Sequence, residues 1–76
     1  SEDVGVHLDR RTRMMYDAKH IFINGESFRA AGKDATLMRA LANTRSMAAK
    51  DVARLSDDAR ELLMQWCEDG WLYATD

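Results

Sequence analysis

The stretch that most constrains this chain is residues 56–73, SDDARELLMQWCEDGWLY, because it carries its own helix start and helix end. Ser56 is a preferred N-cap residue, and the carboxylates of Asp57 and Asp58 complement the unpaired N–H groups and the dipole of a first helical turn. Gly70 supplies the left-handed conformation that commonly ends a helix. The stretch therefore predicts a closing helix, and the apolar residues after Gly70 predict a short terminal strand.

One face of this predicted helix is apolar at the helical period. Its members recur at i, i+3, i+4, i+7 and i+8: Ala59, Leu62, Leu63, Trp66 and Cys67. We expect a shared core of residues from this region and two leucines of an earlier helix: Leu62, Leu63, Trp66, Trp71, Leu37 and Leu41. The lone cysteine and three methionines are expected to fill the same core: Cys67, Met38, Met47 and Met64.

Composition limits the class of protein. A chain of 76 residues is one small domain, which buries roughly 60% of its unfolded surface. Its net charge of −2 argues against general affinity for nucleic acid or membranes, which needs an excess of Lys and Arg. A single cysteine cannot form an internal disulfide, so we expect a reducing, cytoplasmic location. No apolar run approaches the ~18 residues of a membrane span, and Ser1 rather than Met favours a fragment of a longer protein.

The first part of the chain is predicted to lie outside the fold. Residues 1–12 have weak alternation and are expected to form a flexible tail or linker, or an edge strand when preceding chain is present. Residues 13–76 are expected to form the domain. Arg10, Arg11 and Arg13 make a basic cluster, which we interpret as a solvated face, with a patch for an acidic partner as the alternative.

Residues 13–29 predict a three-stranded antiparallel meander. Residues 14–16 and 20–23 are rich in β-branched, aromatic and other apolar side chains, and a turn-compatible triplet separates them. Asn24-Gly25 is a strong hairpin signal, because a type I′ turn needs positive φ at both central residues. Residues 26–29 would be the returning strand. His20 is expected at the surface of this sheet.

The rest of the chain predicts a helix-turn-helix in its winged form. Asp34 is expected to cap a helix that ends near residues 43–44, and a short helix is expected over 49–55. The terminal strand is expected to pair with residues 45–47. The predicted fold class is thus α+β: a small winged-helix-like domain with an N-terminal β-hairpin or meander, three helices and a short C-terminal strand.

No catalytic, cofactor-binding or metal-binding residue is predicted. His7 and Asp9 match the His-x-Asp pair of a facial iron triad, but His20, the remaining histidine, lies too close along the chain to complete one. The glycines form no phosphate-binding loop. The acidic residues of the closing helix and its ends are interpreted as a solvated face: Asp57, Asp58, Glu61, Glu68 and Asp69.

Charge also argues against DNA binding. In winged helices that read DNA, the N-terminal residues of the third helix contact bases. Here that end carries Asp57, Asp58 and Glu61, and Arg60 is the cation of the helix. Residues 34–76 hold five Lys or Arg against eight Asp or Glu, a net charge of −3. Phosphates would be repelled where a DNA reader must neutralise several of them.

Two motifs carry a family resemblance. Residues 16–26, YDAKHIFINGE, and the terminal GWL of residues 70–72 resemble the C-terminal region of the bacterial cupin/JmjC-type ribosomal oxygenases, over roughly residues 10–74. The resemblance implies a parent enzyme that uses Fe(II) and 2-oxoglutarate to hydroxylate an arginine of a large-subunit ribosomal protein. Such enzymes join a catalytic cupin barrel, a helical dimerisation segment and a C-terminal winged helix. Their iron and 2-oxoglutarate contacts lie upstream of this chain, so no catalytic residue carries over.

The resemblance implies an accessory winged-helix domain that makes protein or substrate contacts rather than performing catalysis. Its expected partners are the upstream catalytic domain of the same polypeptide and a basic ribosomal protein. Two alternatives stay open: a stand-alone winged-helix DNA-binding regulator, and a protein-interaction or dimerisation module unconnected to an enzyme.

We expect the isolated chain to have no oxygenase activity, because its sequence supplies no metal triad. Fe(II) and 2-oxoglutarate added to the purified chain should leave its NMR spectrum unchanged, and 2-oxoglutarate should not be consumed. Saturable shifts centred on His7 and Asp9 would contradict this prediction.

Overall fold

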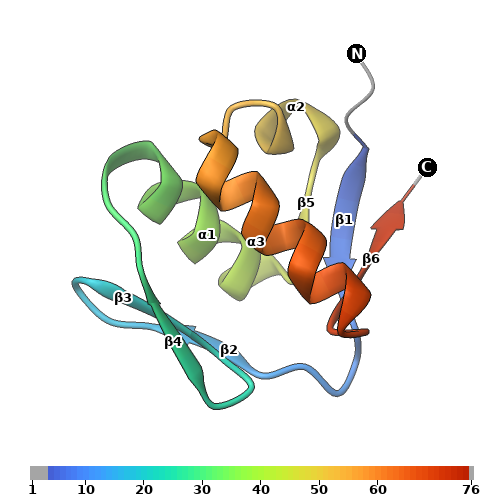
Figure 1. The fold of residues 1–76 in the computed structure, drawn as a ribbon, viewed down its shortest axis with the longest axis horizontal. Helices are drawn as coiled ribbons and strands as arrows, with labels where there is room; N and C mark the ends of the chain where they lie inside the picture. Colours follow the sequence, from blue (N-terminus) through green and yellow to red (C-terminus); the bar gives the residue numbers. More distant parts are fainter. Residues whose placement is uncertain (1–3, 76) are drawn as a thin grey trace.

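A computed structural model of the protein describes residues 4–75, and Figure 1 shows its helices lying beside its small sheets. In chain order the elements are β1 (Gly5–Leu8), β2 (Met14–Tyr16), β3 (His20–Ile23), β4 (Glu26–Arg29), α1 (Gly32–Thr44), β5 (Ser46–Met47), α2 (Ala49–Val52), α3 (Asp57–Glu68) and β6 (Leu72–Thr75). The predicted α+β, winged-helix-like arrangement is confirmed.

The first sheet has the strand order β5-β1-β6, and both pairings are antiparallel. Residues 1–3 of the tail expected over residues 1–12 lie outside the described residues. For the rest of that range the structure differs from the prediction, because β1 is the central strand. It also corrects the expected pairing of the terminal strand with residues 45–47, since β1 lies between β6 and β5. Val6 and Leu8 are buried on one side of β1, and two apolar side chains are too weak a pattern to reveal a central strand.

Gly5 allows the three strands to approach closely at one end of this sheet. A Cβ atom built on Gly5 would lie 2.7 Å from Oγ1 of Thr75 on β6 and 2.9 Å from the carbonyl oxygen of Met47 on β5. Real side chains do not tolerate either distance. Gly5, which lies within the range expected to be a tail or linker, is thus a packing requirement of β1.

The second sheet is the predicted meander, with the order β2-β3-β4. Asn24 and Gly25 have φ values of 49° and 88°, as the predicted hairpin turn requires. Oδ1 of Asn24 also accepts a hydrogen bond of 2.9 Å from the backbone N–H of Arg13, which joins the turn to the start of β2. His20 lies half-exposed on β3, as expected.

Of the two predicted N-cap residues, Ser56 is confirmed and Asp34 is not. Ser56 caps α3 as predicted, because its Oγ accepts a hydrogen bond of 3.2 Å from the backbone N–H of Ala59. The prediction for Asp34 was wrong, since the N-cap of α1 is Ala31. The carboxylate of Asp34 instead accepts hydrogen bonds from the backbone N–H and the hydroxyl of Ser56, at 2.9 and 2.6 Å. It therefore joins the starts of α1 and α3, which sequence spacing does not reveal.

The core lies between the helices and the two sheets. Trp66 is 1% exposed, and the Phe28 ring of β4 lies 5.7 Å from its ring. Four further predicted core residues are buried: Leu37, Leu41, Leu63 and Met38. Met47 is buried as well, while Leu62 and Trp71 are partly buried.

Two core predictions were wrong. Cys67 is exposed, and Met64 is 64% exposed. Their helical spacing suggested a wide apolar face, but the buried face of α3 is narrow and consists of Ala59, Leu63 and Trp66. The small β5-β1-β6 sheet leaves the flank with Met64 and Cys67 uncovered.

Replacing the central aromatic ring should unfold much of the domain. Trp66→Ala should lower the free energy of unfolding by about 3–5 kcal/mol, because it leaves a large cavity between α3 and β4. Met64→Ala, on the same helix but exposed, is the matched control and should change it by less than ~0.5 kcal/mol. Chemical denaturation followed by far-UV circular dichroism measures both. Equal midpoints for the two variants would contradict the packing described here.

Candidate functional site

The helix-turn-helix presents an acidic end to solvent. Residues 53–56 join α2 to α3, so the start of α3 lies at the surface next to α2 (Figure 1). Asp57, Asp58 and Glu61 are all exposed there, and the side chain of Asp57 is 91% exposed. This acidic end, Asp57–Asp58–Glu61, occupies the position from which a DNA-reading winged helix contacts bases.

The cations near the acidic end are ion-paired within their own segments. A guanidinium nitrogen of Arg60 lies 2.6 Å from Oδ1 of Asp57, one helical turn away. Arg54 lies 3.4 Å from Oδ1 of Asp51 in the same i, i+3 relation. These pairs cancel positive charge that a phosphate backbone would need. The geometry thus agrees with the charge count made from the sequence.

A second surface is an apolar groove of about 400 Å³ between α3 and the β1–β6 edge of the first sheet. Met64 and Val4 are 64% and 43% exposed there, and Cys67 is exposed as well. β6 is an outer strand in the order β5-β1-β6, so the groove lies next to a sheet edge. Sequence reasoning missed this surface because it assigned Met64 and Cys67 to the core. The remaining lining residues are Val6, Val52, Arg60, Leu63, Leu72 and Ala74.

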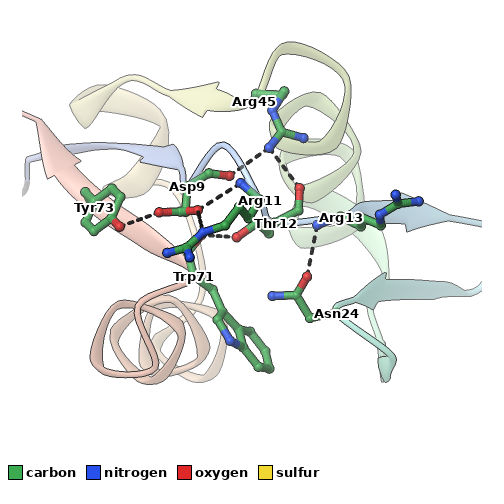
Figure 2. Close-up of polar contacts among 8 residues, drawn as sticks. All are labelled: Asp9, Arg11, Thr12, Arg13, Asn24, Arg45, Trp71 and Tyr73. Carbon is green, nitrogen blue, oxygen red and sulfur yellow. Dashed lines mark hydrogen bonds and ion pairs between the residues drawn. The ribbon is translucent and has the colours of Figure 1, made fainter.

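A polar cluster around Asp9 joins the two ends of the described chain (Figure 2). Asp9 is 8% exposed, and its carboxylate accepts hydrogen bonds from the Tyr73 hydroxyl and, at 2.8 Å, from the backbone N–H of Arg11. These donors lower the pKa of Asp9 from 3.8 to about 2, with Tyr73 as the largest cause. The same hydrogen bond raises the pKa of Tyr73. The cluster has no sequence signature, since Asp9 and Tyr73 are 64 positions apart.

Backbone atoms of the same region are held by Arg45 and Thr12 (Figure 2). A guanidinium nitrogen of Arg45 donates to the carbonyl oxygens of Asp9 and Thr12, each at 2.8 Å. The Thr12 hydroxyl donates to the carbonyl oxygen of Trp71 at 2.6 Å. These contacts fix the path from β1 to β2 against the start of β6. The cluster is therefore structural in character.

Both residues of the His-x-Asp motif contact Tyr73 in this structure. The ring of His7 lies 5.5 Å from that of Tyr73, and the Asp9 carboxylate is occupied by the donors described above. Between residues 4 and 75, no group of three His, Cys, Asp or Glu side chains is arranged to hold a metal ion.

The basic cluster predicted at residues 10–13 does not converge on a site. Arg10, Arg11 and Arg13 are all exposed, and Nε of Arg11 lies 3.3 Å from Oδ1 of Asp9. This agrees with a solvated face. Within the described range, no helix is long and apolar enough to span a membrane.

Comparison with known proteins gives one finding. A family model described as ROXA-like winged helix matches residues 2–73 of the chain. The match runs from before β1 to within β6, so it includes the strand that the sequence had suggested to be a tail. No curated protein and no solved structure matched the chain.

Stability should depend on pH through Asp9. Its folded-state pKa of about 2 lies below its ordinary value of 3.8, so its contribution is complete above pH ~4 and is lost as the pH falls towards 2. Asp9→Asn should therefore be less stable than the wild type at pH 7, and the difference should shrink between pH 4 and pH 2. Urea denaturation across this range measures it.

The matched control is Asp58→Asn, which removes an exposed carboxylate and should follow the wild-type curve within ~0.5 kcal/mol. Asp17, whose pKa is lowered by the backbone N–H groups of Lys19 and His20, is present in all three proteins and cancels. A stability difference for Asp9→Asn that is the same at pH 7 and pH 2 would contradict the role of its charge.

Proposed function

Because the chain belongs to the ROXA-like winged-helix family, we propose that it is the accessory C-terminal domain of a cupin-type ribosomal protein hydroxylase. In this proposal the domain makes protein contacts and performs no chemistry itself. Fe(II) and 2-oxoglutarate are held by the catalytic domain upstream, and the parent enzyme acts in the cytoplasm on a ribosomal protein.

The observation that carries the proposal is the acidic end of α3. A basic ribosomal protein segment has the charge that Asp57, Asp58 and Glu61 attract, whereas a DNA phosphate backbone has the opposite charge. The pairing of Arg60 with Asp57 at 2.6 Å strengthens this preference, since it uses the cation of the helix. Fold alone does not decide between a protein and a DNA partner, so the electrostatics of the site must.

The apolar groove is a second observation that supports the same proposal. Exposed Met64 and Cys67 lie beside the edge strand β6, and a contiguous apolar surface of this kind is typical of protein interfaces. In the proposal this groove packs against the catalytic part of the parent polypeptide. The acidic end then stays open for the basic substrate.

The rival function is a stand-alone DNA-binding regulator, and one pair of titrations separates the two. We expect duplex DNA to bind with a Kd of about 10⁻⁴ M or weaker at physiological salt. A lysine- and arginine-rich peptide should bind more tightly and should shift the amide signals of residues 56–61. NMR titration of the labelled protein with each ligand measures both.

Charge-neutral variants locate the binding surface. The double variant Asp58→Asn with Glu61→Gln should weaken peptide binding about fivefold. The effect is modest because each exposed charge pair contributes at most ~1 kcal/mol to binding. Asp57 is left intact because it is paired with Arg60. The control variant, Glu26→Gln with Asp17→Asn, removes the same charge from β4 and the β2–β3 turn and should change binding less than twofold. Sub-micromolar DNA binding at α3 would overturn the proposal in favour of the regulator.

A further inference from the structure

A basic hollow of about 590 Å³ lies where β4 leads into α1, beside the turn that joins β2 to β3. Four alanines and one glycine line it, and their short side chains leave the space open. The other three lining residues are cations: Lys19, Arg29 and Arg39. Figure 1 shows the β2–β3 turn and the N-terminus of α1 on the same side of the domain, and residues of both line the hollow.

The three cations differ in how firmly they are held. Arg39 is partly buried and donates from a guanidinium nitrogen to the carbonyl oxygen of Ala18 at 3.3 Å, with its guanidinium 6.0 Å from the centre of the Tyr16 ring. Among the described residues, the side chains of Lys19 and Arg29 are exposed and make no hydrogen bond or ion pair. The hollow thus has one oriented charge and two that are available to a ligand.

None of the described residues that line the basic hollow carries a carboxylate. Asp17, close in sequence, accepts hydrogen bonds of 2.8 and 2.7 Å from the backbone N–H groups of Lys19 and His20. Asp34, on the first turn of α1, accepts hydrogen bonds from Ser56. It lines a neighbouring pocket that shares Arg29, Ala30 and Ala31 with the hollow. The hollow therefore concentrates positive charge on a chain whose net charge is −2.

We propose that the basic hollow binds the carboxylates of an extended acidic peptide segment. The proposal goes beyond the proposed function, because the hollow and the acidic end of α3 attract partners of opposite charge. β4 is an outer strand in the order β2-β3-β4, and it runs directly into the hollow. An extended segment can therefore lie along β4 while its carboxylates reach Lys19, Arg29 and Arg39.

A peptide fits the charge distribution better than a nucleic acid does. The phosphates of a nucleic acid continue beyond any single hollow, and residues 34–76 carry a net charge of −3 even with Arg39 of the hollow included. A short acidic segment needs only the hollow itself.

The test is an NMR titration of the labelled chain with acetylated hexaglutamate, and with hexaglutamine as the uncharged control peptide. We expect saturable shifts at residues 18–19 and 29–32 with hexaglutamate and none with hexaglutamine. Lys19→Gln with Arg29→Gln should weaken hexaglutamate binding about tenfold. Arg10→Gln with Lys50→Gln removes the same charge from exposed positions elsewhere and should weaken it less than twofold.

Each other outcome overturns the proposal. Equal weakening by the two double variants would mean that only net charge matters. Tighter binding of single-stranded hexauridylate at the same amides would assign the hollow to RNA phosphates, and an absence of saturable shifts would remove the site. Far-UV circular dichroism checks the folding of each variant. If Arg29→Gln disturbs β4, the single variant Lys19→Gln serves as the test instead, and it should weaken hexaglutamate binding about threefold.

Discussion

The pairing of β1 with both β5 and β6 is the contact on which the rest of the domain depends. Strands of two to four residues are not stable alone, and here the central strand makes one sheet of three. The segment after β1 is then fixed by Arg45, which donates to the carbonyl oxygens of Asp9 and Thr12. That segment leads into β2, so the second sheet takes its position from the first. The helices pack their apolar faces between two sheets placed in this way.

Local signals in the sequence were sufficient for most of the fold. Ser56 caps α3, and Asn24-Gly25 forms the expected turn, because both signals act through neighbouring backbone atoms. Contacts between distant segments were not predictable in the same way. Asp34 looked like a cap but bonds to Ser56, and Gly5 looked like part of a linker but permits close strand packing. Helical spacing gave Cys67 a core position, yet which flank of α3 is covered depends on the width of a sheet that the sequence did not show.

The surfaces were less predictable than the fold. Charge counting identified the acidic end of α3, since Asp57, Asp58 and Glu61 are consecutive or one turn apart. The apolar groove and the basic hollow each combine residues from separate elements, so neither has a local signature. A domain of this kind carries acidic, apolar and basic surfaces at different places, and a winged-helix fold by itself says nothing about which of them is used.

The β1–β6 ladder also has a consequence for how the chain folds. The β2-β3-β4 sheet forms between near neighbours in sequence, and loops of a few residues close within about a microsecond. The contact between Asp9 and Tyr73 spans 64 positions. Closing so long a loop costs chain entropy, and this cost comes before the contacts between β1 and β6 can offset it. We therefore see the domain as a locally folding sheet and helices whose last step joins the two ends. Until that step, the edge of β1 that pairs with β6 is open to other chains.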